Sequence, residues 1–414
     1  MTDISGDERL AHVRHQEWPG STWRFALAGL CAALVGLGLA RFAYTPLIPA
    51  LISAKWFNPS DVVYLGAANL AGYLAGALLA RPMAARIKAV SALRAMMVLA
   101  TLSCFACSVP VSFLWFFVWR FLAGLTGGII MVLAPSVVLP HTSPAKRGIV
   151  GGVIFAGVGL GVAASGTLVP LLLQQGLRES WYGLGALSAL LTLISWTSWP
   201  KQAPAAISPA ASPHPKRHRQ SRAVRALLIQ YGLNACALVP HMVFIVDFVA
   251  RGLGRGISAG SHDWVLYGLG AIVGPLVTGH LGDRAGFGPA LRVAFLVEAI
   301  AVLLPAVSAT PASLIVSSVI VGSFTPGIVP LVLRRIHEFL PHDAEQQRAA
   351  WGDATTSFAL FQAGSAYGFS WLFSHSGGDY PLLFWLGGGA VTLALAIDLV
   401  MGLAGARKSR ETTW

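Results

Sequence analysis

Long apolar stretches follow one another along this chain, separated by short polar segments. A helix needs about 20 predominantly apolar residues to cross a membrane. In hydrocarbon each backbone group must bond within its own segment, and stretches of this length without alternation are not barrel strands. The pattern therefore predicts an all-α integral membrane protein with twelve transmembrane helices at residues 23–50, 61–80, 92–110, 112–139, 149–174, 180–199, 224–249, 263–281, 289–308, 312–333, 350–374 and 381–404.

A segment of different composition divides the twelve spans into two sets of six. Residues 200–222 are rich in Pro, Ala, Ser and basic residues, which predicts a disordered or loosely membrane-attached linker. Because six is an even number, the two sets have the same orientation, as in a parallel repeat. We therefore expect an N-terminal segment, a six-helix bundle, a linker, a second six-helix bundle and a tail, at residues 1–22, 23–199, 200–222, 223–405 and 406–414.

An offset of 203 residues (279 − 76) aligns the first half of the sequence with the second. Each single identity in this alignment is weak evidence, because the chain is so rich in Gly and Ala. Because the same offset serves three helix pairs, it predicts an internal repeat. It aligns Gly76–Arg81 with Gly279–Arg284, Arg120–Gly124 with Ser323–Gly327, and Phe155 and Gly161 with Phe358 and Gly364.

Charge fixes the expected orientation of the helices. Of 29 Lys and Arg residues, Arg41 and Arg120 lie deep inside spans and four lie on one side of the membrane, which leaves 23 (29 − 2 − 4) on the side of the termini and the linker, some of them at the ends of spans. Short loops rich in Lys and Arg stay in the cytoplasm, so both termini and the linker are predicted to be cytoplasmic. The four residues expected on the other side are Lys55, Arg178, Arg251 and Arg255.

Composition excludes several other classes of protein. The chain is 55% hydrophobic and 11% charged, with a mean hydropathy of +0.66, whereas an average soluble domain has about 25% charged residues. The net charge of +12 follows from topology and lipid headgroups, because a nucleic-acid partner would need a clustered basic domain. No Walker loop, metal-ligand cluster or nucleophile triad is present in the sequence, so we expect no cofactor, no metal and no enzymatic activity.

A charged, glycine-rich run joins the eighth and ninth spans. It reads Gly279-His-Leu-Gly-Asp-Arg-Ala-Gly-Phe-Gly288, and the simpler interpretation is an ordinary turn capped by Asp. The run resembles the loop signature of the major facilitator superfamily, G-x-x-x-D-R-x-G-x-x, which Gly279, Asp283, Arg284 and Gly286 match. The resemblance implies a twelve-helix secondary transporter in which this loop is a cytoplasmic gate that braces two helices.

Two further stretches resemble the same superfamily. Arg120–Gly128 matches the R-x-x-x-G pattern of its fourth helix, and Gly157–Gly166 is similar to the glycine-rich fifth helix of its antiporters, although the proline expected after Gly161 is absent. In the first half Ala80 stands where the gate motif has Asp, so a symmetric charge relay is not expected. The resemblance covers residues 23–404.

The end of the first span carries an unusual cation. The run Gly36-Leu-Gly-Leu-Ala-Arg-Phe-Ala-Tyr-Thr-Pro-Leu-Ile-Pro49 is similar to one mostly uncharacterised bacterial branch of the superfamily, which implies an inner-membrane protein, and we expect a monomer. An arginine inside a span must face protein or water. Tyr44 and Thr45 lie within a turn of Arg41, so the three residues predict a substrate-binding surface. The alternative is that Arg41 snorkels or pairs with an acid for structural reasons.

Other polar residues inside spans complete the candidate substrate site. Arg120 either faces Arg41 across the cavity that the superfamily fold implies or bonds to helix carbonyls. Gln230, Asn234 and His241 share one stripe of the seventh span, and Thr355 and Gln362 share a face of the eleventh. The candidate substrate-binding residues are Arg41, Tyr44, Thr45, Arg120, Gln230, Asn234, His241 and Gln362.

Three titratable residues are candidates for proton coupling. Asp247 lies toward the outer end of the seventh span. It either takes part in proton coupling or only lies at the water-filled entrance of the cavity. His241 either carries a proton or is a packing histidine. Glu298 lies in the ninth span, which by resemblance is peripheral, so structural pairing is the main alternative there.

The sequence thus predicts a secondary transporter that works by alternating access, with substrate near the midplane between the bundles. Two buried arginines and few cavity acids favour a small organic anion driven by the proton gradient. The first alternative is proton-coupled efflux of a hydrophobic or aromatic compound, held by Trp115, Trp119 and other aromatic residues. A remote alternative is a membrane sensor that transports nothing.

Overall fold

The computed structural model describes residues 19–200, 221–341 and 343–411, and the regular structure in these ranges is helical, without strands. The first helical rod changes its hydrogen bonding along its length and is followed by five further rods. Their elements are α2 Pro19–Ala33, the π-helix η1 Leu34–Phe42, α3 Tyr44–Ser53, α4 Pro59–Arg86, α5 Ala89–Ala106, α6 Phe113–Val138, the short η2 Leu139–His141 and η3 Pro144–Lys146, α7 Arg147–Leu173 and α8 Leu177–Trp196.

The second half repeats this arrangement. Its first rod again contains π-helical turns, and five further rods follow. Its elements are α9 Arg222–Val239, the π-helix η4 Pro240–Phe244, α10 Ile245–Asp247, the π-helix η5 Phe248–Gly252, α11 Gly256–Ala285, α12 Phe287–Val307, α13 Pro311–Phe339, α14 Ala344–His375 and α15 Tyr380–Glu411. Twelve rods in two sets of six confirm the predicted fold class.

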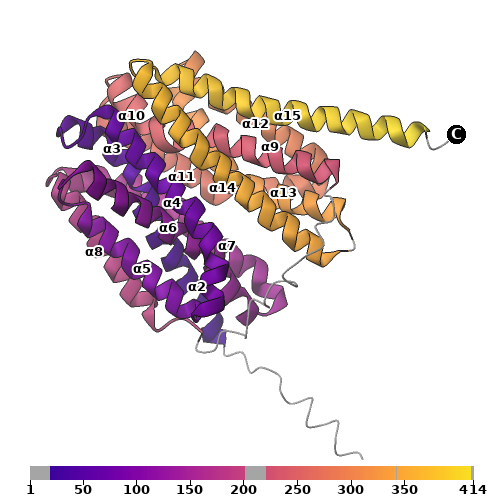
Figure 1. Ribbon diagram of the computed structural model, residues 1–414, viewed down its shortest axis with the longest axis horizontal. Helices are drawn as coiled ribbons and strands as arrows, with labels where there is room; N and C mark the ends of the chain where they lie inside the picture. The colour runs from indigo at the N-terminus through magenta and orange to yellow at the C-terminus, as the bar shows by residue number, and fades with distance from the viewer. Residues whose placement is uncertain (1–18, 201–220, 342, 412–414) are drawn as a thin grey trace, which may run out of the picture.

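The two sets form two bundles that lie side by side (Figure 1). Elements α2–α8, coloured indigo to magenta, make the first bundle, and α9–α15, coloured red to yellow, make the second. We call the end of the bundles where α8 stops and α9 starts the linker face. The end where α3 stops and α4 starts is the opposite face.

The outer surface of the bundles is apolar, as a bilayer requires. Leu193 of α8 and Leu276 of α11 expose 70% and 73% of their surface, and many other large apolar side chains also point outward. Across the described ranges, ten helical stretches are long and apolar enough to cross a membrane by length and composition. Soluble proteins rarely expose apolar surface so continuously, so this surface has the character that a membrane-spanning protein needs.

Helix-capping residues define where several of the rods begin. The side chain of Asn58 accepts a hydrogen bond from the amide of Asp61 at 2.8 Å, and proline follows at the first position of α4. Ser112 caps α6 and Thr310 caps α13 in the same way, at 3.1 and 3.3 Å. Such caps satisfy amides that have no partner at a helix start, so these polar residues end the loops and start the next spans.

Close helix crossings reveal the true register of the internal repeat. A Cβ at Gly124 would meet the carbonyl of Asn69, and a Cβ at Gly322 would meet that of Tyr267. Both differences, 322 − 124 and 267 − 69, are 198 residues. The crossings of α4 with α6 and of α11 with α13 are therefore equivalent at an offset of 198.

The predicted offset of 203 is wrong for these two helix pairs. It does relate the starts of the first rods, Pro19 and Arg222 (222 − 19), and of the last rods, Leu177 and Tyr380 (380 − 177). Different connection lengths make the register change along the chain, so one offset cannot serve every pair. At the observed offset, Ala85 and not Ala80 corresponds to Asp283. Because positions 80 and 85 are both alanine, the first half lacks the acid at either offset.

Most of the predicted linker, residues 201–220, lies outside the described residues, as do residues 1–18 and 412–414. The expected cytoplasmic location of this segment therefore remains a prediction. Ser212→Cys, in a background without Cys31, Cys104, Cys107 and Cys236, should resist a membrane-impermeant maleimide in intact cells and react after lysis. Arg178→Cys on the opposite face should react in intact cells. Labelling of position 212 before lysis would reverse the topology.

Candidate functional site

A π-helical segment places a cation in the middle of the first rod. In η1 the amide of Ala43 bonds to the carbonyl of Gly38 at 3.0 Å, five residues earlier. Such segments inside α-helices occur frequently at functional sites. Arg41 lies on η1 and is only 7% exposed. A guanidinium at this depth is stable only with protein partners or water around it.

The Arg41 side chain reaches from the first bundle to the second. Its Nη2 donates a hydrogen bond of 2.8 Å to Oε1 of Gln362 on α14. The guanidinium carbon also lies 4.5 Å from the ring centre of Tyr73, within cation–π range. The buried Nε has no partner, and the ion pairs among the described residues do not include Arg41. Its charge is thus held by neutral groups alone.

Arg120 supports the segment that carries Arg41. Its Nη1 and Nη2 donate to the carbonyls of Ala40 and Arg41 at 2.7 and 3.4 Å, and its guanidinium lies 4.1 Å from the ring centre of Tyr44. Its own carbonyl accepts a bond from Asn69 at 3.0 Å. The π-helical geometry displaces carbonyls of η1 from their usual partners, and Arg120 satisfies two of them. This is the geometry that the structural alternative for Arg120 describes.

The two π-helical rods meet at the same level. The hydroxyl of Thr45 donates to the carbonyl of Met242 in η4 at 2.6 Å, and the amide of Gln362 lies 3.4 Å from the Met242 sulfur. The Tyr44 hydroxyl instead bonds within its own bundle, to the carbonyl of Val62 at 2.8 Å. Of the predicted substrate residues, the structure therefore brings Arg41, Tyr44, Thr45, Arg120 and Gln362 together.

A small cavity lies among these side chains. Its volume is about 20 Å³, and its lining includes Arg41, Tyr44, Thr45, Asn69, Arg120 and Met242. About 10–15 Å³ of such space holds one water molecule. The site is therefore nearly filled in this conformation, and a solute can enter only when the bundles move apart.

Hydrogen bonds join the bundles from the level of Arg41 to the opposite face. Besides Arg41–Gln362 and Thr45–Met242, Ser60 bonds to Ser374 at 2.6 Å, and the Trp264 indole donates to Ser165 at 3.1 Å. Gly159 and Gly166 of α7 also cross α11 so closely that a Cβ would meet backbone atoms there, at 2.9 and 2.8 Å. These contacts seal the interface on the side of the opposite face.

The predicted gate lies at the end of α11. Residues 279–285 are helical, so the connection to α12 is Gly286 alone, with a φ of +83° that favours glycine. The prediction of a longer tight loop is therefore wrong. Asp283 and Arg284 are exposed, and in the part of the chain that the structure describes neither has a hydrogen-bond or ion-pair partner. They brace no helix in this conformation, so the gating role remains a prediction.

The polar stripe of the seventh span faces the inside of the second bundle. The Asn234 amide donates to Oε2 of Glu298 on α12 at 2.6 Å, and Nε2 of His241 bonds to Ser317 on α13 at 2.7 Å. Gln230 is buried, and its Oε1 has no partner among the described residues. Helical spacing predicts that these residues share one face of the helix, but not which way that face points. Here it points into the second bundle, where its side chains find polar partners. The structure does not bring Asn234 and His241 to Arg41.

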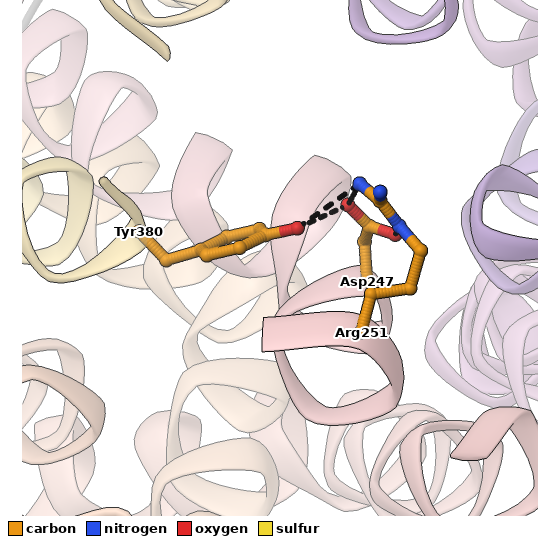
Figure 2. A network of polar contacts seen from close by, with 3 residues as sticks. All are labelled: Asp247, Arg251 and Tyr380. Carbon is orange, nitrogen blue, oxygen red and sulfur yellow. Dashed lines mark hydrogen bonds and ion pairs between the residues drawn. The ribbon is translucent and has the colours of Figure 1, made fainter. Parts of the chain in front are cut away.

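Asp247 belongs to a compact network at the opposite face (Figure 2). Arg251, one turn later, donates to both carboxylate oxygens of Asp247 at 2.5 and 2.6 Å. The Tyr380 hydroxyl donates to the same carboxylate at 2.6 Å. Arg251 and Tyr380 also line a cavity of about 360 Å³ between the bundles. The charge of Asp247 is therefore balanced by Arg251 next to this cavity. Glu298, by contrast, has the amide of Asn234 as its partner and no cation among the described residues.

The tryptophans of the efflux alternative lie away from the cavity. Trp115 and Trp119 contact each other edge to face, with ring centres 5.6 Å apart. Trp115 is 38% exposed, and its indole donates to the carbonyl of Ala106 at the end of α5. The interpretation of these two residues as cavity aromatics is wrong, because the face of α6 that carries Trp115 points away from Arg120.

Sequence reasoning missed three residues of the site. Asn69 and Tyr73 are polar residues four apart inside an apolar span, so the helical spacing could have identified them. Met242 contributes a backbone carbonyl and a sulfur atom, and neither has a sequence signal.

Comparisons with known proteins agree with this arrangement. Residues 33–399 match the family model described as "Uncharacterised MFS-type transporter YbfB". Among solved structures, a D-xylose-proton symporter superposes with a TM-score of 0.71 at 15% identity, over 92% of this chain and 97% of that one. No curated protein sequence matches significantly. The likeness to the symporter shows a shared fold. Because the family match covers most of the chain, this protein belongs to the YbfB-type family of major facilitator superfamily transporters.

Proposed function

We propose that this transporter moves a small organic anion across the membrane by alternating access, driven by a proton gradient, with Arg41 as the residue that holds the anion. The chain is a multi-pass membrane transporter and not an enzyme. We further propose that it works as a monomer in a bacterial inner membrane, with both termini in the cytoplasm.

The surroundings of Arg41 carry this proposal. Its guanidinium is buried at the bundle interface, where Gln362 and Tyr73 hold it and no ion pair of the described residues neutralises it. A carboxylate can accept two parallel hydrogen bonds from one guanidinium, and such charge-assisted bonds are about twice as strong as neutral ones. An anion is thus the ligand that the chemistry of this site favours.

The cross-bundle contacts support alternating access. Gln362 and Met242 belong to the second bundle, and they bind Arg41 and Thr45 of the first. A substrate carboxylate that takes the place of Gln362 on Arg41 would be reached from both bundles. Its binding energy can then stabilise a closed state, and its release lets the bundles separate on the other side.

The proton gradient is the proposed energy source. One solved structure that resembles this chain is that of a proton symporter, and this likeness adds a precedent within the fold. The efflux alternative has less support, because Trp115 and Trp119 lie outside the cavity.

A ligand screen tests the proposal. The purified protein should show a raised unfolding temperature with one or more small mono- or dicarboxylates and no shift with lipophilic cations. D-xylose serves as a neutral comparison. Stabilisation by lipophilic cations with no response to any carboxylate would remove the anion proposal and favour efflux.

The gate gives a further prediction. With the opposite face closed, the Asp283 and Arg284 side chains have no partner among the described residues, so we expect them to brace neighbouring helices only in the opposite conformation. Asp283→Asn should lower the transport rate several-fold and leave folding and anion binding nearly unchanged. Glu338→Gln, which removes an exposed acid of the same face from its pair with Arg335, is the matched control. A normal rate for Asp283→Asn at normal expression would end the gate assignment.

A further inference from the structure

The carboxyl group of Glu298 lies in the interior of the second bundle. We propose that Glu298 binds the transported proton there, in a reciprocal pair with Asn234 that is separate from the anion at Arg41. Transport of this proton rests on the proposed function, whereas proton binding at this position does not. The site would be occupied by a proton alone, without a metal ion or cofactor.

The hydrogen bonds of the pair lack one donor. Nδ2 of Asn234 donates to Oε2 of Glu298 at 2.6 Å, while Oε1 of Glu298 and Oδ1 of Asn234 are both buried without a partner in the described chain. Buried oxygens without partners are costly. One proton added to the carboxylate forms an O–H bond that can donate to the amide oxygen. The pair then becomes a carboxylic acid and an amide that each donate and accept once.

No ion pair among the described residues includes Glu298. Among the ion pairs of the described residues, Arg251 is bound to Asp247, and Arg292 of α12 is bound to Asp398 of α15 at 2.6 Å. Two titratable groups of neighbouring elements have partners other than Glu298: Tyr267 of α11 bonds to Thr325, and His241 of η4 bonds to Ser317. An acid in a membrane without a cation partner indicates function more often than packing.

Several polar groups of the second bundle lie between Glu298 and the opposite face. The hydroxyl of Ser317 donates to the carbonyl of Ala301, one turn beyond Glu298 on α12, at 2.6 Å. Ser317 must then accept from Nε2–H of His241, which leaves Nδ1 of His241 as an acceptor without a partner in the described chain. Nearer the opposite face, Asp247 bonds to Tyr380, which lines the 360 Å³ cavity. These polar groups lie apart from Arg41, and among the described residues no hydrogen bond joins His241 to Asp247.

The proton site is connected to the anion site through one rod. Asn234 lies on α9, and Met242, whose carbonyl binds Thr45 of the first bundle, lies on η4 directly after it. Protonation changes the bonding of Asn234 at one end of this rod. The change can act on the bundle contact at the other end, which gives proton and anion a mechanical link without direct contact.

Infrared difference spectroscopy of the full-length protein in lipid vesicles tests the site without a substrate. Acidification of the parent protein should produce the C=O stretching band of a protonated carboxyl group. Glu298→Gln should remove this band. Asn234→Leu should move it to higher frequency, because the carbonyl loses its N–H donor. The Asn234 variant keeps the test informative if Glu298→Gln folds poorly.

Asp398→Asn is the matched control, since Asp398 is a buried acid of the same bundle that already has a cation partner. It should leave the band in place. An unchanged band in Glu298→Gln, or an unshifted band in Asn234→Leu, would overturn the proposal. Failure of the anion proposal would show in ligand binding and not in this spectrum, so the two failures are distinguishable.

Discussion

Arg41→Gln is expected to abolish specific binding of the anionic substrate. Among the described residues that line the cavity, Arg41 and Arg120 are the cations, and Arg120 is engaged with backbone carbonyls. The variant therefore removes the cation that can bind a carboxylate. Charged hydrogen bonds contribute about 1.5–3 kcal/mol each, so the loss of a bidentate pair should weaken Kd by at least about 100-fold. Arg41→Lys should keep part of the affinity through charge and lose the bidentate geometry.

Isothermal titration with the carboxylate selected by the ligand screen measures this effect. Arg178→Gln, which removes an exposed cation of the opposite face, controls for the general loss of positive charge. Parent-like affinity in Arg41→Gln would make Arg41 a structural residue. A cationic substrate would have the same consequence and would leave efflux as the better account.

Arg120→Gln is expected to act through stability. The shorter, neutral side chain cannot donate to both Ala40 and Arg41, so buried carbonyls of η1 lose their partner. Each unsatisfied group costs about 1–3 kcal/mol. The unfolding temperature should therefore fall by several degrees with or without ligand, and Arg41 should lose its fixed position.

Thermal unfolding of Arg120→Gln and Arg41→Gln, measured side by side, separates the two roles. Arg41→Gln should unfold close to the parent temperature, because it removes a buried charge that has few partners. If Arg120→Gln unfolds like the parent but fails to bind the anion, Arg120 contacts the substrate directly. The positioning role would then be wrong.

Helix existence could be predicted from the sequence because apolar stretches of sufficient length leave no other structure in a bilayer. The offset between the two halves could not be predicted, because glycines recur too often in the sequence to define one alignment. The crossing of Gly124 on Asn69 and of Gly322 on Tyr267 needed the packed helices to show the offset of 198. The end of α11 shows a related limit, because glycines that suggested a loop continue the helix up to Gly286.

The candidate site was predictable where a charge had to find a partner. A cation inside a span must be buried among polar groups, so Arg41 was identified together with its neighbours Tyr44 and Thr45. The direction of a polar stripe depends on distant residues, and for Asn234 that residue is Glu298, 64 positions later. The π-helical turns of η1 and η4, which free the carbonyls that Arg120 and Thr45 bind, carry no sequence signal.

Flux through the purified protein in proteoliposomes tests the central claim most directly. The vesicles contain the parent protein, the carboxylate selected by the ligand screen is added outside, and a proton gradient is imposed across the bilayer. We predict accumulation above the external concentration that disappears when a protonophore collapses the gradient. Binding of the carboxylate without any flux, under a maintained gradient, would contradict transport and leave a membrane sensor as the remaining account.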